Sequence, residues 1–190
     1  MSRRAMVRPG GRSARVQQAV HTAVRELQAE VGRPELTVPM VAARAGVTPS
    51  TIYRRWGDLQ ELLSDVAVEH LRPEAPPEDH GDLLADLRGW AEQFLEEMSS
   101  PAGRAYIRDA LLGDADGDNA GRCSAYAAEQ IAVVLARAEE RGEEAPDVET
   151  VLDRVVAPMM YRILFRPAGL TDAYADRLAR EAVQGFGAPR

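Results

Sequence analysis

The chain has 190 residues and a formal net charge of −7. Its length and its 45% hydrophobic content suffice for one ordinary domain or two small ones with a packed core. Its single cysteine, Cys123, excludes an intrachain disulfide, and no apolar run approaches the length of a membrane span. The basic start lacks the apolar segment of a secretory signal, so we expect a cytoplasmic protein with no membrane partner.

Positive charge gathers in the first third of the chain. Residues 1–60 hold ten arginines against four acids, whereas residues 61–190 hold thirteen arginines against twenty-six acids. An acidic protein repels DNA unless its positive charge is confined to one part. The distribution therefore favours a DNA-binding segment at the N-terminal end.

The chain begins with a basic arm and a first helix. Residues 1–12 are rich in Arg, Gly and Pro and predict a flexible arm, which is either a plain tail or a segment that enters a DNA minor groove. From Ser13 to Val31 apolar side chains recur at helical spacing, and Gly32 ends the pattern.

Two short helices joined by a tight turn follow between Leu36 and Trp56. Each is preceded by a threonine that can serve as its N-cap and has a proline in its first turn. The first is expected from Val38 to Ala45, and the second from Pro49 to Trp56. Gly46 tolerates the left-handed conformation that ends the first, so the spacing predicts a helix-turn-helix.

The second of these helices has more polar side chains than its core contacts need. Ile52 and Trp56 are the expected core residues, which leaves basic and hydroxyl side chains for phosphates and base edges. The predicted DNA-contacting residues are Thr37, Arg44, Thr48, Pro49, Ser50, Thr51, Tyr53, Arg54 and Arg55. The alternative is an ordinary corner between two helices with a solvated basic face.

The segment AARAGVTPSTIYRRW, with an amphipathic helix before it and a leucine-rich one after it, resembles the N-terminal domain of the tetracycline-repressor (TetR) family over residues 15–66. The stretch VLDRVVAPMMYRILFRPAGLTDAYADRL, Val151 to Leu178, is similar to the C-terminal part of an actinobacterial-type subgroup. One position departs from the family pattern, because Leu59 stands where many members have a phosphate-binding lysine. Asp58 still predicts an N-cap that leaves backbone N–H groups available there.

Helices are expected along the rest of the chain. A fourth helix from Leu59 to near Arg72 completes a DNA-binding domain of residues 13–72, and the proline-rich, acidic residues 73–82 form a linker to a ligand-binding and dimerisation domain of residues 83–190. In that domain we expect helices at residues 83–98, 102–112, 122–141, 148–165 and 171–186. The fold is therefore all-α with about nine helices, and Pro158 predicts a kink inside the helix that contains it.

The helix at residues 148–165 is apolar over more than one stripe, so we expect one face to pack in the core of its own subunit and another to contact a partner. The resemblance implies a homodimer in which this helix and the last one form half of an intermolecular four-helix bundle. The predicted interface residues are Val148, Leu152, Val156, Met159, Ile163, Tyr174 and Leu178. The alternative is the bulky core of a monomer.

An effector cavity in the second domain would be lined by aromatic and methionine side chains from several helices. The candidates are Trp90, Phe94, Met98, Tyr106, Ile107, Tyr126, Met160, Tyr161 and Phe165. Few charged residues fall on apolar faces, which mildly favours an uncharged or lipophilic molecule. Plain core packing is the alternative for each of these residues.

The sequence gives no support for catalysis, a metal or a cofactor. His21, which we place on the exposed side of the first helix, shares no metal-ligand spacing with His70 or His80. Three aspartates in the segment GDADGDNAG follow the start of a calcium loop, but Asn119 and Ala125 stand where glycine and glutamate are required. We therefore expect no enzyme.

The expected function is that of a transcriptional regulator whose partners are a double-stranded DNA operator, a second copy of the chain and a small-molecule effector. As the resemblance implies, it represses from a palindromic operator, and the effector tilts the fourth helix and releases DNA. The alternatives are a helical dimeric adaptor and an all-α enzyme that does not bind an operator.

Overall fold

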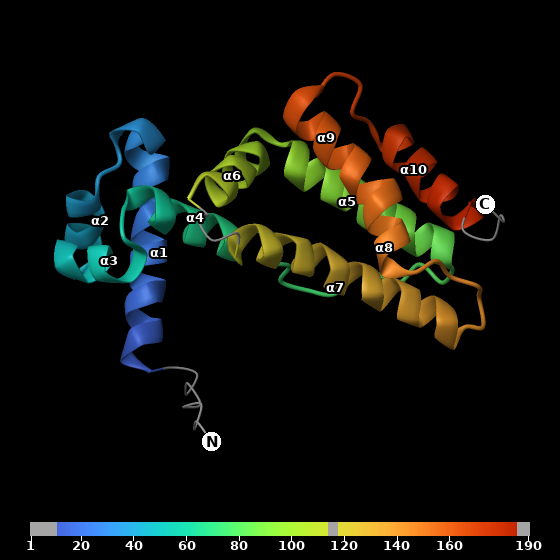
Figure 1. The fold of residues 1–190 in the computed structure, drawn as a ribbon, viewed down its shortest axis with the longest axis horizontal. Helices are drawn as coiled ribbons and strands as arrows, with labels where there is room; N and C mark the ends of the chain where they lie inside the picture. Colours follow the sequence, from blue (N-terminus) through green and yellow to red (C-terminus); the bar gives the residue numbers. More distant parts are fainter. Residues whose placement is uncertain (1–10, 114–117, 186–190) are drawn as a thin grey trace.

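The computed structural model describes residues 11–113 and 118–185, and every regular element within these ranges is a helix. Figure 1 shows α1 to α3 at one end of the molecule, α5 to α10 at the other, and α4 between them. Counting the continuous run of α8, a π turn and α9 as one, the described residues hold nine α-helices, as the sequence predicted. Nearly all of the predicted basic arm lies outside the described residues.

The N-terminal bundle consists of α1 (Arg12–Val31), α2 (Val38–Ala45), α3 (Pro49–Trp56) and α4 (Leu59–His70), with a short 3-10 turn (Arg33–Glu35) after α1. Its core is formed by apolar side chains that recur at helical spacing. Those wholly removed from solvent are Val20, Val24, Val41, Ile52 and Leu62. Burial of each stabilises the bundle by about 1.5–3 kcal/mol, which fixes the short helices α2 and α3 that could not persist alone.

The turn between α2 and α3 has the predicted geometry. The Thr37 hydroxyl caps α2 by accepting the Met40 N–H, and Gly46 ends the helix in the left-handed region, at φ 66° and ψ 32°. The Val47 N–H then donates to the Ala42 carbonyl at 3.0 Å, which closes the helix end. This closed turn sets the direction in which α3 leaves.

The C-terminal bundle surrounds one central helix, α5 (Leu83–Ser99). Against it or beside it lie α6 (Pro101–Leu112), α7 (Asp118–Glu140), α8 (Val148–Val151), α9 (Ala157–Phe165) and α10 (Asp172–Gln184). The largest fully buried side chains of this bundle are Leu87, Ile131, Met159 and Ile163. The apolar stripes of α5, α7, α9 and α10 therefore meet in one core.

A single wide turn accommodates the proline inside the α8–α9 run. Residues Leu152–Val156 form a π turn, in which the Ala157 N–H donates to the Leu152 carbonyl. Pro158 has no N–H to donate, and its ring would crowd the carbonyl four residues earlier. The sequence predicts a kink at this proline, and the structure has a π turn just before it, after which the helix continues to Phe165.

The predicted linker lies along α7 (Figure 1). Gln130 and Arg137 of α7 donate hydrogen bonds to the carbonyls of Ala75 and Pro77, at 3.2 and 2.8 Å. At the far end the wholly buried Asp86 accepts from the His80 N–H and, at 3.0 Å, from Arg141. These bonds hold the segment in place over its length.

Within the described ranges, no helix combines the length and the apolar composition needed to cross a membrane.

Candidate nucleic-acid interface

The outer face of α3 is polar because the apolar side chains of this helix point into the core. Ile52 and Trp56 are 0% and 6% exposed and anchor the helix in the core of the N-terminal bundle. Tyr53 is 50% exposed, and Ser50 and Arg54 are also exposed. An anchored helix that presents a phenol, a hydroxyl and a guanidinium can approach base edges and phosphates.

The first turn of α3 carries a cluster of three hydroxyl groups. Thr48 Oγ1 lies 2.9 Å from Ser50 Oγ and 3.0 Å from Thr51 Oγ1. The sequence suggested Thr48 as the side-chain cap of α3, but its hydroxyl makes no cap hydrogen bond. The hydroxyls bond to one another instead, so this end of α3 offers several groups that can donate or accept.

The two adjacent arginines of α3 have different surroundings. Arg55 donates from Nη1 to the carbonyl and hydroxyl oxygens of Ser13, at 3.0 and 2.9 Å, and from Nη2 to Gln17. None of these contacts involves Arg54, although both arginines line an open groove of about 940 Å³ between the start of α1 and α3. Arg54 is therefore the better placed of the two for a phosphate, whereas Arg55 ties α3 to α1.

Arg44, at the end of α2, is held by acids of α1. Its guanidinium binds both carboxylate oxygens of Glu30, at 2.8 and 2.7 Å, and reaches Glu26 at 3.2 Å. The hydrogen bond from Arg44 lowers the pKa of Glu30. The sequence predicts Arg44 as a DNA contact, and in the structure it forms solvent-exposed ion pairs with these two acids.

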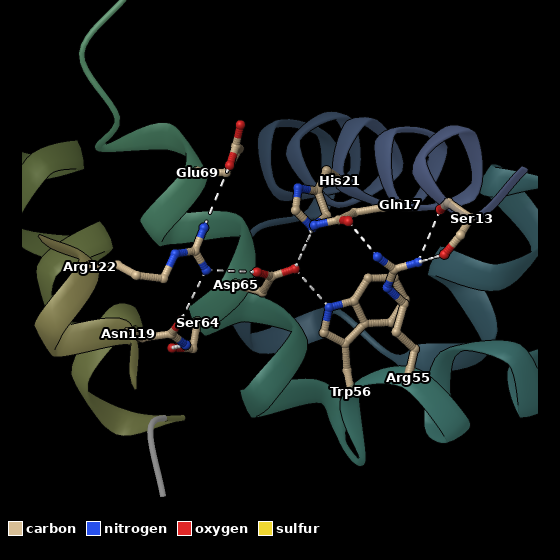
Figure 2. A network of polar contacts seen from close by, with 10 residues as sticks. All are labelled: Ser13, Gln17, His21, Arg55, Trp56, Ser64, Asp65, Glu69, Asn119 and Arg122. Atoms are coloured by element: carbon tan, nitrogen blue, oxygen red, sulfur yellow. Dashed lines mark hydrogen bonds and ion pairs between the residues drawn. The ribbon is translucent and has the colours of Figure 1, made fainter. Parts of the chain in front are cut away.

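Behind α3 lies a polar network centred on Asp65 of α4 (Figure 2). Asp65 Oδ2 accepts from Trp56 Nε1 at 2.9 Å and from Gln17 Nε2 at 3.2 Å, and it lies 2.9 Å from His21 Nε2. His21 is 2% exposed, so its expected place on the exposed side of α1 is wrong. It follows Val20 directly and shares a face with Val24, which was the available signal for its burial.

The ionised form of Asp65 is strongly favoured. Burial by itself raises the pKa of this carboxyl group, but hydrogen bonds from His21 and Trp56, and weaker interactions with Arg122, outweigh it and hold the pKa well below its usual range. Sequence reasoning did not single out Asp65. The available signal was a carboxylate placed between apolar residues of a leucine-rich helix, in the segment LLSDVAV.

A second set of polar contacts joins the two bundles. The Arg33 guanidinium, just after α1, lies 2.6 Å from the buried Asp109 carboxylate of α6 and donates to Gln60 of α4 at 2.8 Å. Close by, the Ser64 hydroxyl donates to the Ala110 carbonyl at 2.7 Å. The helices α4 and α6 are thus bonded through buried groups.

The residues proposed for an effector cavity lie in three different places. Trp90 and Ile107 are buried in the C-terminal core, with Phe94, Met98 and Met160 packed at its edge. Tyr106 and Tyr126 belong to a separate small cluster with Ala67 and Val68 of α4. Tyr161 and Phe165 are 56% and 69% exposed. The nine side chains therefore do not surround one common space.

Most of the residues proposed for the dimer interface pack in the core of the protomer. Met159, Ile163, Tyr174 and Leu178 are at most 9% exposed, whereas Val148, Leu152 and Val156 are half-buried. The exposed apolar side chains of this region are Tyr161 and Phe165, whose ring centroids lie 5.3 Å apart. The buried members of the set thus belong to the core of the protomer, while this ring pair is open to solvent.

The other residues considered for metal binding are the histidines and the calcium-like segment. No group of three or more His, Cys, Asp or Glu side chains there is arranged to hold a metal ion. The His70 ring stacks on Tyr106 with centroids 3.9 Å apart, and burial and the charge of Arg25 lower its pKa. Asp114 and Asp116 of the calcium-like segment lie outside the described residues.

Comparisons with known proteins agree with this geometry. The family described as "Bacterial regulatory proteins, tetR family" matches residues 21–66, and "Tetracyclin repressor-like, C-terminal domain" matches residues 77–182. The HTH-type transcriptional regulator YdeS of Bacillus subtilis is 25% identical over 181 residues, which cover 88% of this chain and 87% of YdeS. AqdR of Rhodococcus erythropolis, also an HTH-type regulator, is 32% identical over 97 residues, about half of each chain (51% and 47%).

Solved structures share the whole fold. The TetR family transcription regulator SCO0332 superposes with a TM-score of 0.67 at 27% identity, over 92% of this chain and 99% of that one. The Thermus thermophilus FadR repressor in complex with lauroyl-CoA gives a TM-score of 0.53 at 18% identity, over 92% and 96%, which is a likeness of fold alone. The two family matches cover both helical bundles in order, so the chain belongs to the TetR family of helix-turn-helix transcriptional regulators.

Proposed function

We propose that the protein is a homodimeric repressor that binds a near-palindromic operator through α3 of each subunit and leaves it when a small molecule binds. The observation that carries this proposal is the outer face of α3, where Ser50, Tyr53 and Arg54 are exposed on a helix anchored by Ile52 and Trp56. The excess of arginine in residues 1–60 supplies the attraction for phosphates. The remainder of the chain is acidic and would face away from the duplex.

Each polar residue of α3 is given a role by its place on the helix. Ser50 and Thr51 lie in the first turn, the part of a recognition helix that reaches base edges, so we assign them to sequence readout. Tyr53 and Arg54 lie later on the exposed face and are assigned to phosphates. Asp58 caps α4 by accepting the Glu61 N–H at 2.8 Å, which leaves neighbouring backbone N–H groups available for a further phosphate.

The proposed boundaries are a DNA-binding domain of residues 13–72 and a dimerisation and effector domain of residues 83–190. Two copies joined through the exposed rings of Tyr161 and Phe165 would present two α3 helices to successive major grooves. One short helix binds weakly by itself, which is why the operator model needs the dimer. We place the protein in the cytoplasm, where the operator is.

A lipophilic molecule suits the effector site. Phe94, Met98 and Met160 are only partly buried at the edge of the C-terminal core, and methionine side chains repack readily around a ligand. The fold neighbour FadR was solved with lauroyl-CoA, which is a fact about that protein and supports only the general class. The proposed entry point is therefore this edge of α5 and α9.

Selection of DNA from a random-sequence pool by the full-length protein tests the proposal. We expect enrichment of a sequence with two-fold symmetry, and we expect Ser50→Ala with Thr51→Ala to change the enriched sequence. Arg108→Gln, an exposed change on α6 far from α3, is the control. A protein that enriches nothing above the starting pool at low salt would be an adaptor or an enzyme on the same fold.

A further inference from the structure

The carboxylate of Asp65 has its two oxygens directed to different parts of the molecule. Oδ2 faces α1 and α3, where it meets Gln17, His21 and Trp56 within 3.2 Å. Oδ1 faces α7, where Arg122 Nη1 lies 3.3 Å away. Figure 2 shows α7 on one side of the carboxylate and helices α1 and α3 of the N-terminal bundle on the other.

The contacts on the Oδ2 side close into a ring. Gln17 donates to Asp65 and accepts from Arg55, and the neighbour of Arg55 along the chain, Trp56, donates to Asp65. The Arg55 guanidinium also lies 5.0 Å from the centroid of the Trp56 ring. Because Trp56 is the last residue of α3, this ring fixes the C-terminal end of that helix against α1 and α4.

The contacts on the Oδ1 side are longer and more exposed. Arg122 is 40% exposed and divides its guanidinium between Asp65, Asn119 at 3.3 Å and Glu69 at 3.7 Å. Asn119 in turn donates to Ser64 at 2.7 Å, and Ser64 donates to the Ala110 carbonyl of α6. The helix α7 thus reaches Asp65 through a longer contact, at 3.3 Å, than the 2.9 Å bond from Trp56.

We propose that Asp65 is the positioning residue of α3 and that Arg122 of α7 sets the position of its carboxylate, so that the C-terminal bundle controls how α3 meets the operator. This inference rests on the proposed function, because it names how the DNA-contacting helix is held. Trp56 and Asp65 do not touch DNA in this scheme. They set the angle at which Ser50 and Thr51 reach the bases.

The indole N–H of Trp56 provides a test that needs neither effector nor operator. The chain has two tryptophans, and Trp90 lies in the C-terminal core, so a ¹⁵N-labelled sample has one indole resonance to test and one as an internal reference. Trp56→Phe assigns the first. We expect Arg122→Gln to move the Trp56 resonance and to speed its exchange with solvent, while the Trp90 resonance stays in place.

Arg108→Gln is the matched control for this substitution. It makes the same chemical change, and among the described residues the Arg108 side chain bonds along its own helix, to the Arg104 carbonyl at 3.1 Å. It should leave both resonances unmoved. The proposal fails if Arg122→Gln leaves the Trp56 indole as Arg108→Gln does.

DNA binding distinguishes positioning from a purely structural effect. On the selected fragment we expect Asp65→Asn and Arg122→Gln each to lower the ratio of specific to non-specific affinity by about fivefold or more, with non-specific affinity and its salt dependence unchanged. An equal loss for selected and scrambled fragments would mean a smaller folded fraction and would overturn the positioning role. If no fragment can be selected, the proposed function fails, and the indole resonance still decides whether Arg122 acts on Trp56.

Discussion

Arg54 and Arg55 are adjacent residues with the same charge, but their environments give them separate roles. Both arginines line the open groove beside α3, but Arg55 also makes three hydrogen bonds to α1, and its guanidinium lies over Trp56. Residues on a helix turn by about 100° at each step, so neighbours face different surroundings. We therefore propose that Arg54 supplies attraction to DNA and that Arg55 anchors α3.

Single substitutions of these arginines should separate the two roles. Arg54→Ala is expected to reduce the slope of log affinity against log salt by about one and to leave the melting temperature unchanged. Arg55→Ala is expected to lower stability by about 0.5–1.5 kcal/mol through the lost bonds to Ser13 and Gln17. Binding titrations at several salt concentrations, with thermal unfolding of each variant, provide the measurement. Equal salt slopes for Arg54→Ala and wild type would contradict the assignment.

The carboxyl group of Asp65 makes stability depend on acid pH. Its pKa is depressed in the folded protein, so its contribution is complete above the pKa of the unfolded chain, about 3.9, and is lost as pH falls from there toward the lower folded value. We expect the unfolding free energy of wild type to fall more steeply below about pH 4 than that of Asp65→Asn. Denaturant unfolding at pH 7, 4 and 3 measures this difference, and parallel pH profiles would argue against it.

At the scale of elements, glycines mark the places where two helices approach closely. A Cβ atom added at Gly113 would lie 2.3 Å from the Gln60 carbonyl oxygen and 2.8 Å from Ser64 Cβ, so α6 and α4 can pack this closely only with glycine at that position. A Cβ at Gly121, in the exposed part of α7, would meet no heavy atom of another described segment within 4 Å. The two glycines therefore have opposite consequences when replaced.

Gly113→Ala should destabilise the protein by about 1–3 kcal/mol, since backbone and not a flexible side chain must shift. Gly121→Ala should stabilise it by about 0.5–1 kcal/mol, because alanine loses less conformational freedom in a helix. Chemical denaturation of both variants against wild type tests the pair. A neutral Gly113→Ala would mean that α4 and α6 can separate at no cost.

At the scale of the whole molecule, the surface of α9 carries the features expected of contact between copies. Tyr161 and Phe165 are exposed one turn apart on α9, and the π turn before Pro158 lies on the same continuous helix. The buried stripe of the same helix, which includes Met159 and Ile163, already belongs to the core of the protomer. In the proposed dimer, assembly and folding would therefore use different faces of one helix.

Charged substitutions should separate these two faces. Phe165→Glu is expected to yield a folded monomer, whereas Met159→Glu is expected to unfold the C-terminal bundle, because an unpaired charge there would be wholly buried. Light scattering gives the mass and circular dichroism the fold. Wild-type protein that is monomeric at micromolar concentration, or a Phe165→Glu protein that remains a dimer, would refute the proposed interface.

The sequence predicted local features well and side-chain partners poorly, for a physical reason. Caps, Gly46 and helical periodicity act over a few residues, so the order of helices and the turn before α3 could be read directly. The pairs Arg55–Ser13 and His21–Asp65 join residues 42 and 44 positions apart, and no local pattern specifies them. Likewise, a helix that is apolar over two stripes does not reveal which stripe faces the core.

The bonds from Arg33 to Asp109 and from Asp65 to Arg122 have a consequence for exchanging parts between relatives. Residues 73–82 look like the natural place to cut, yet each of these bonds has one partner on either side of that cut. A chimera that joins residues 1–72 to another regulator's second half would leave Asp65 facing a foreign side chain at the place of Arg122. We therefore expect a working hybrid to need positions 109 and 122 along with residues 1–72, which would make the exchangeable unit larger than the proposed DNA-binding domain.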